Sequence, residues 1–143
     1  MNTNNEIKEK LLSHGIKPSL QRMAVMEYLS EHRTHPTAEM IFNDLSPSIP
    51  TLSKTTVYNT LRLLSDQGAI LSLNIDERNV RYDGYMVAHA HFRCKKCEKI
   101  FDIIENPMNV PGQDFVQKSK DFRITECQVY YKGYCKDCEK ELN

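Results

Sequence analysis

Residues 89–102, HAHFRCKKCEKIFD, carry an unusual density of side chains that bind metals. A C-x-x-C pair, Cys94 and Cys97, lies in this stretch and has a counterpart near the end of the chain, Cys135 and Cys138. Four thiols in two such pairs suit a tetrahedral zinc ion with no open coordination position. The spacing therefore predicts a closed structural zinc site that joins this stretch to the C-terminal residues.

A C-x-x-C pair also occurs as the redox motif of thioredoxin-like folds. This chain has two pairs and no βαβ pattern around them, which favours zinc over a thiol oxidoreductase. A fifth cysteine, Cys127, is left over. We expect it to pack within a strand and not to bind metal.

The same stretch contributes to a second set of candidate ligands. His89 and His91 are one residue apart, so their side chains point to the same face of a strand. With one more histidine and two aspartates of the chain, they form a set of three imidazoles and two carboxylates. Such a set suits Fe(II) or Mn(II) better than structural zinc. Taken singly, such residues also serve as surface or capping groups, which is the role we expect for His14 and His32. The predicted regulatory site, with ligands from both halves of the chain, consists of His35, Asp83, His89, His91 and Asp102.

The bulk composition is that of an ordinary soluble protein. The chain has 143 residues, of which 40% are hydrophobic and 27% are charged, enough for one domain or two small ones. No apolar run reaches membrane-spanning length, and the polar N-terminus lacks a signal-peptide pattern. We therefore expect a cytoplasmic protein with reduced cysteines. Lys and Arg total 19 and so do Asp and Glu, so DNA binding would need a local basic face.

The first half has a helical pattern that ends in two short strands. We expect helices over 5–13, over 20–31 with Ser19 as N-cap, and over 54–65 with Ser53 as N-cap and Gly68 as the residue that ends it. A further helix, capped by Thr37, carries Ile41 and Leu45. AILSLNI and VRYD then predict a hairpin around 76–79. A group of helices whose last helix has a polar face, followed by a hairpin, is the layout of a winged-helix domain.

The predicted helix over 54–65 has two distinct faces. Val57, Leu61 and Leu64 form an apolar stripe. The polar face could contact base edges and phosphates, although a solvated surface would have the same pattern. The hairpin that follows favours DNA binding. The candidate DNA-binding residues are Lys54, Thr55, Thr56, Tyr58, Asn59 and Arg62.

The second half changes to strands rich in β-branched and aromatic residues. HFRC, KIFDIIE and FRITECQVYYKG predict a sheet, with a loop over 106–112 and a helix over 113–120 that uses Phe115 and Val116. Exposed sheet edges favour pairing with a second copy. The predicted fold class is α+β, with an N-terminal winged-helix DNA-binding domain (1–83) and a small α/β dimerisation domain with structural zinc (84–143).

Five segments together resemble the ferric uptake regulator (Fur) family, over nearly the full chain: GIKPSLQR, HPTAEMIF, SKTTVYNTLRLLSDQG, the H-x-H-x-x-C-x-x-C block and YCKDC. The resemblance implies a homodimer with zinc on the four cysteines. It also implies metal-activated repression at palindromic operators. The second half of the chain would then provide the dimer contact.

Within this family the chain is most similar to the peroxide-sensing branch, which uses three histidines and two aspartates at the positions given above. Iron-sensing relatives usually have glutamate where this chain has Asp83. In the peroxide-sensing branch, Fe(II) reacts with hydrogen peroxide and a ligand histidine is oxidised, which here implies His35 or His89. A further metal site of many iron sensors is expected to be missing, because its positions are Ala88, Ala90, Glu126 and Cys127.

The main alternative is a metal-supply sensor of the same fold, for iron or zinc, with reversible metal control and no histidine oxidation. A metalloenzyme would belong to another class. The sequence offers no obvious general base or substrate pocket for one, and the polar helix would stay unexplained.

Overall fold

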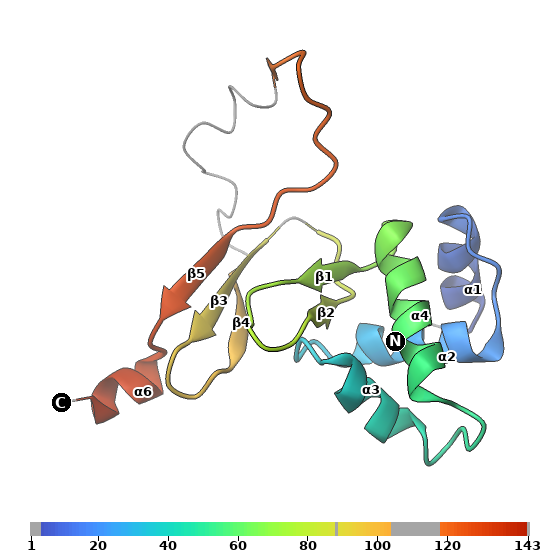
Figure 1. Ribbon diagram of the computed structural model, residues 1–143, viewed down its shortest axis with the longest axis horizontal. Coiled ribbons are helices and arrows are strands. Elements are labelled where there is room, and N and C mark those ends of the chain that lie inside the picture. The colour runs from blue at the N-terminus through green and yellow to red at the C-terminus, as the bar shows by residue number, and fades with distance from the viewer. Residues whose placement is uncertain (1–3, 88, 104–117, 143) are drawn as a thin grey trace. The chain divides into compact units, whose positions relative to one another are not determined.

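The computed structural model describes residues 4–87, 89–103 and 118–142 (Figure 1). The chain divides into two compact units, Met1–Met86 and Val87–Asn143. The predicted loop over 106–112 lies outside the described residues. So does most of the predicted helix over 113–120, including Phe115 and Val116. The described residues contain no helix long and apolar enough to cross a membrane.

The first unit is a four-helix cluster followed by a two-stranded antiparallel hairpin. Ser19, Thr37 and Ser53 each accept a hydrogen bond at the N-terminus of a helix, as the sequence predicted. Gly68, which follows the last helix, has a φ of +78°, a conformation that glycine adopts without steric cost. The elements are α1 (Asn4–Ser13), α2 (Leu20–Glu31), α3 (Ala38–Leu45), α4 (Lys54–Asp66), β1 (Leu71–Leu73) and β2 (Arg81–Asp83).

The core of this unit lies among the four helices. The expected stripe of α4 is confirmed, since Val57, Leu61 and Leu64 are fully buried. Helix α2 buries a wide face, including Val25 and Tyr28, because it contacts α1, α3 and α4. The remaining core residues include Ile7, Leu11, Ile16, Leu29, Ile41, Leu52, Ala69 and Ile70.

The second unit holds a three-stranded sheet in the order β4-β3-β5 and a short terminal helix. Central β3 pairs antiparallel with β4 and parallel with β5. Helix α6 begins directly after Cys135 and was not predicted, because its six residues are too few for a helical repeat of apolar positions. The elements are β3 (Ala90–Cys94), β4 (Ile100–Ile103), β5 (Tyr130–Gly133) and α6 (Lys136–Glu141).

The long strand predicted over FRITECQVYYKG is wrong for its first eight residues. Pairing between β3 and β5 starts at Tyr130, because β3 itself begins at Ala90 and offers no earlier partner. Phe122 and Ile124 are exposed instead of packed. Cys127 is also exposed and lies outside any strand, so its expected place in a packed strand is wrong as well.

Truncation of Leu61 tests the core of the first unit. Because this side chain is fully buried, Leu61→Ala is expected to lower the free energy of unfolding by about 2 to 5 kcal/mol. Urea unfolding followed by helical circular dichroism reports mainly on this unit, which holds α1–α4. The control is Asn59→Ala, exposed on the same helix, which is expected to cost less than about 0.5 kcal/mol. Equal effects of the two changes would contradict the assigned core.

Candidate metal centres

Four thiols converge in the second unit. Cys94 ends β3, Cys97 lies in the turn before β4, and Cys135 and Cys138 lie at the start and middle of α6. Their sulfur atoms all lie within 4.8 Å of one another. Cys97 Sγ and Cys135 Sγ are 3.9 Å apart. A tetrahedral zinc ion with Zn–S bonds of about 2.3 Å places its sulfurs about 3.8 Å apart, so this donor set fits zinc.

Backbone amides stabilise the thiolate form of Cys94. Burial alone would raise its pKa, but N–H groups of Cys135, Cys97 and Lys96 outweigh burial and lower the pKa to about 6. The pKa of Cys138 is instead raised to about 12, first by burial and then by the neighbouring thiols. Cys94 is therefore already prepared for metal, while Cys138 would lose its proton as a cation binds.

One of the two lysines between Cys94 and Cys97 forms an ion pair with the terminal helix. Lys96 Nζ lies 2.6 Å from Glu141 Oε2 of α6. The pKa of Lys96 is raised mainly by this hydrogen bond, with smaller contributions from Cys138 and Cys94. Lys96 therefore connects the turn between Cys94 and Cys97 to α6. Its ammonium group also interacts electrostatically with the thiols of Cys94 and Cys138.

In the first unit, two of the predicted regulatory ligands form a buried pair. His35 Nε2 lies 3.6 Å from Asp83 Oδ2, and both side chains are 2% exposed. His35 belongs to the loop between α2 and α3, and Asp83 is the last residue of β2. Burial of an imidazole and a carboxylate this close together is typical of a ligand pair or of an ion pair.

In the second unit, the other three predicted ligands face one another. His89 Nε2 and His91 Nε2 lie 3.3 and 3.5 Å from the same oxygen of Asp102, as the alternation of side chains predicted. His89 Nδ1 lies 2.6 Å from the carbonyl oxygen of Val87. A carbonyl oxygen only accepts, so Nδ1 carries a proton. The unprotonated Nε2 of a neutral His89 would then meet the carboxylate lone pair to lone pair, an arrangement that a shared cation relieves.

The two other histidines have the capping roles that we expected. His14 Nδ1 lies 2.8 Å from the carbonyl oxygen of Lys10 in the last turn of α1. His32 Nδ1 lies 2.9 Å from the carbonyl oxygen of Tyr28 at the end of α2, and its ring stacks on that of Tyr28. Both rings thus bond carbonyls in the last turn of a helix, and the Tyr28 carbonyl also accepts the backbone N–H of His32.

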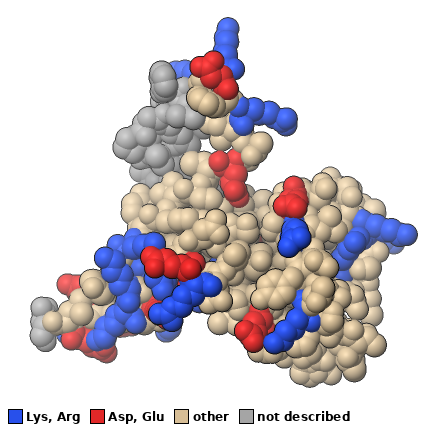
Figure 2. Space-filling view, viewed as in Figure 1, with Lys and Arg blue, Asp and Glu red and all other residues tan. Residues whose placement is uncertain are grey.

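The predicted DNA-binding face of α4 is accessible. Lys54, Thr55, Tyr58, Asn59 and Arg62 are exposed, whereas Thr56 is half-buried. The Thr56 hydroxyl lies 2.9 Å from that of Ser53, so it also supports the helix cap. On the face of the described residues that Figure 2 shows, lysines and arginines lie beside carboxylates and form no broad basic surface.

Two cations near this face were missed by the sequence reasoning. Lys17 and Arg22 line an open groove of about 390 Å³ whose other wall includes Thr56 and Asn59 of α4. The motif GIKPSLQR, which contains both cations, contributed only to the family resemblance. A linear pattern does not show that α2 packs beside α4.

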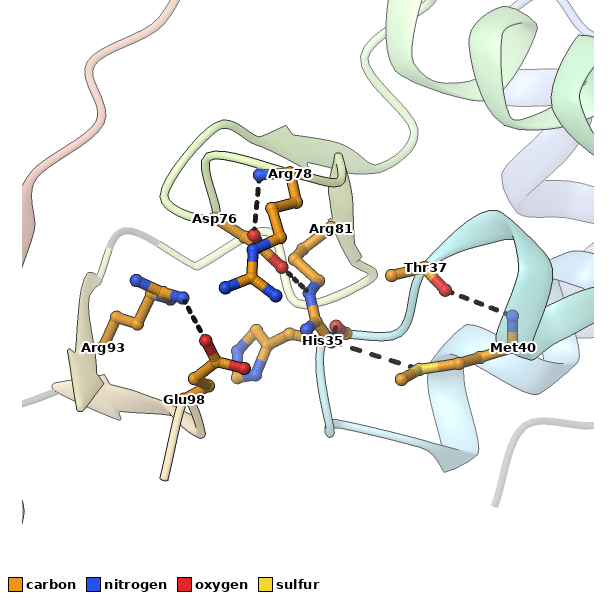
Figure 3. Close-up of polar contacts among 8 residues, drawn as sticks. All are labelled: His35, Thr37, Met40, Asp76, Arg78, Arg81, Arg93 and Glu98. Atoms are coloured by element: carbon orange, nitrogen blue, oxygen red, sulfur yellow. Dashed lines mark hydrogen bonds and ion pairs between the residues drawn. The ribbon is translucent and has the colours of Figure 1, made fainter. Parts of the chain in front are cut away.

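The hairpin turn is fixed by a buried carboxylate. Asp76 accepts hydrogen bonds from the Arg78 N–H at 2.9 Å and from Arg81 Nε at 3.0 Å (Figure 3). Burial raises the pKa of Asp76, but these donors more than compensate and hold it below its usual value. Asp76 is therefore charged at neutral pH and anchors the Arg81 side chain.

The model of the ferric uptake regulator family matches residues 13–132. The chain belongs to this family. It is 34% identical to the peroxide-responsive repressor PerR of Staphylococcus epidermidis over 142 residues, 97% of this chain and 94% of that protein. It is likewise 34% identical to the PerR protein of Staphylococcus saprophyticus, over 90% of this chain and 86% of that one.

Solved structures of the Fur family have the same fold. The Campylobacter jejuni peroxide stress regulator is 26% identical and has a TM-score of 0.69, with 96% of this chain and 100% of that chain covered. The Helicobacter pylori ferric uptake regulator, at 24% identity, has a TM-score of 0.71 and covers 96% of this chain and 95% of its own.

Membership of the Fur family confirms several predictions. The fold class is α+β, with an N-terminal winged-helix DNA-binding domain and a C-terminal dimerisation domain. Fur proteins are metal-dependent DNA-binding repressors that act as dimers, so this chain is a transcriptional regulator and not an enzyme. The cofactors of the family are a structural zinc ion and a regulatory iron or manganese ion, and the chain has a donor set of each kind.

Removal of one thiol tests the zinc site. Because a closed site needs all four donors, Cys138→Ser is expected to reduce zinc from about one ion per chain to well below half, as measured by mass spectrometry of the metal. Amide hydrogen exchange should rise across β3 and β5, which the cysteines join to α6. The control is Cys127→Ser, whose thiol is exposed and outside the cluster. Zinc loss in the control, or full zinc in Cys138→Ser, would contradict the assignment.

Proposed function

We propose that this Fur-family repressor responds to hydrogen peroxide, and that it acts in the cytoplasm as a homodimer on palindromic operators. Its regulatory Fe(II) or Mn(II) would bind His35, Asp83, His89, His91 and Asp102. A twofold symmetric dimer requires two equivalent half-sites, which is why a palindrome is the matching operator. The proposed domains are residues 1–83 for DNA and residues 84–143 for dimerisation.

The observation that carries this proposal is the His35–Asp83 pair, which is 2% exposed and lies within the DNA-binding unit. Two ligands leave a metal ion with most of its coordination positions open. The group of His89, His91 and Asp102 supplies three more of the same chemical kind, without thiols. Nitrogen and oxygen donors of this mixture suit iron or manganese. A metal held by both groups would set the spacing of two α4 helices in a dimer, and hence operator affinity.

Two observations support the peroxide response over simple metal sensing. The curated relatives named above are peroxide-responsive repressors, and the carboxylate ligands of this chain are both aspartates. Bound Fe(II) would supply the reducing chemistry toward hydrogen peroxide, which Mn(II) does not. His35 and His89 would be the residues that gain oxygen, after which their loss as ligands releases the metal and the DNA.

On the DNA, α4 would read the major groove with the hairpin beside it. Tyr58, Asn59 and Arg62 are exposed on one side of α4 and are proposed to contact base edges. Lys54, Thr55 and Thr56 lie at the helix start, where N–H groups and hydroxyls commonly contact phosphate.

Peroxide treatment of two metal forms tests this function. Full-length zinc-containing protein is loaded anaerobically with Fe(II) or with Mn(II). DNA binding is followed by fluorescence anisotropy on a duplex enriched from random sequence by the Mn(II) form. After one equivalent of hydrogen peroxide, the Fe(II) form is expected to lose at least tenfold in affinity, and the Mn(II) form to keep its affinity.

Peptide mass spectrometry then locates the oxidised residues. One added oxygen is expected on His35 or His89. His14 and His32 are internal controls, because both bond helix carbonyls in the same unit as His35. If chelation alone controls DNA binding and neither His35 nor His89 is modified, the protein senses metal supply and the peroxide response is refuted.

A further inference from the structure

Strand β2 contacts the loop that carries His35 through three successive residues. Arg81 Nη1 donates to the carbonyl oxygen of His35 at 3.3 Å, and the N–H of Tyr82 donates to the carbonyl oxygen of Pro36 at 3.0 Å. The third residue, Asp83, lies 3.6 Å from the imidazole of His35. One short strand thus contacts both the backbone and the side chain of a proposed metal ligand.

The backbone of His35 adopts a conformation that needs such support. Its φ is +57°, in the left-handed region that residues other than glycine rarely occupy. His35 also precedes Pro36, and a residue before proline normally prefers an extended conformation. Backbone strain of this kind persists where the surroundings determine it, and it is common at functional sites.

Arg81 is well placed to provide this support because its own side chain is fixed. Its Nε donates to Asp76 Oδ2 at 3.0 Å, and the two side chains are 16% and 6% exposed, respectively. Its Nη1 also lies 4.0 Å from Met40 Sδ on α3 (Figure 3). A guanidinium group has donors in several fixed directions, so one arginine serves the carboxylate and the His35 carbonyl together.

We propose that Arg81 is a positioning residue for the regulatory metal: it holds the carbonyl of His35 and so keeps the imidazole aimed at Asp83. This inference rests on the proposed function, since it requires His35 and Asp83 to be metal ligands. Arg81 and Asp83 point to the same side of β2, as residues two apart in a strand do. The strand therefore supplies one ligand directly and orients the other.

The opposite side of β2 faces α4, the proposed DNA-recognition helix. Tyr82 belongs to the hydrophobic core, and together with Tyr58 and Arg62 of α4 it lines a groove of about 230 Å³. Arg81 itself does not line this groove. Its loss should therefore weaken the metal site first, and DNA binding only through lower metal occupancy.

The test measures Mn(II) affinity of the full-length zinc-containing protein by electron paramagnetic resonance, which detects the free ion. Arg81→Met is expected to weaken Mn(II) binding by about 10-fold to 100-fold, the usual effect of losing a residue that orients a ligand. Arg81→Lys keeps a cationic donor and is expected to recover part of this loss. With saturating Mn(II), Arg81→Met should bind the enriched duplex within about threefold of the wild type.

The matched control is Arg22→Met, which removes an arginine-to-carbonyl hydrogen bond in the same unit, from Arg22 Nη1 to the Lys17 oxygen at 2.8 Å. It is expected to bind Mn(II) within about twofold of the wild type. Thermal unfolding without regulatory metal confirms that each variant is folded at the temperature of the titration. If Arg81→Met acted only through a general loss of stability, Arg81→Lys would not be expected to bind Mn(II) more tightly than Arg81→Met does.

The outcomes distinguish this inference from the proposed function. If wild-type protein binds Mn(II) and His35→Ala abolishes this binding, while Arg81→Met and Arg81→Lys bind as the wild type does, the positioning role is overturned. If His35→Ala and Asp83→Ala bind Mn(II) as tightly as the wild type, the proposed regulatory site itself fails.

Discussion

The described residues of the second unit contain little apolar core. Among them, the buried hydrophobic side chains are Ala90, Cys94 and Cys138, and two of these are thiols of the cysteine cluster. Burial of so little apolar surface by these residues offsets little of the conformational entropy that they lose on folding. A zinc ion bound to the cysteines would stabilise this region, because it would join the end of β3 to α6. Exposed Phe101 and Tyr131 leave apolar surface for the partner subunit.

The first unit is organised differently, around a conventional helical core with the strained His35 loop at its edge. Its proposed metal ligands come from a loop and from the last residue of the hairpin, and Arg81 and Tyr82 of β2 bond the backbone of that loop. A cation bound to both would add a further link between the loop and the hairpin. In the second unit, β3 and β4 hold two of the other proposed ligands in fixed register, since His91 pairs with Asp102 across the sheet. The proposed site thus combines a pair held by contacts between loop and strand with a group held by the register of a sheet.

Most predictions that rest on local signals are confirmed, with α6 as an exception, whereas contacts between distant residues do not show in local patterns. The caps at Ser19, Thr37 and Ser53, the stop at Gly68 and the shared face of His89 and His91 depend on neighbours within four residues. The strand over 122–129 failed because strand formation needs a partner, and β3 starts too late to supply one. The side-chain contact from Arg81 to His35 spans 46 positions, so no local pattern predicts it. The four cysteines could be predicted as zinc ligands because C-x-x-C spacing is itself a local signal.

Lys54, at the start of α4, is proposed to contact DNA phosphate and has a carboxylate close to its side chain. Its Nζ lies 3.5 Å from Glu39 Oε1, and both side chains are largely exposed. A phosphate that contacts this lysine must compete with the carboxylate, although an exposed ion pair of this kind is weak. The whole chain carries equal numbers of cations and anions, so its net charge provides no general attraction to DNA. Affinity for an operator must therefore come from local contacts.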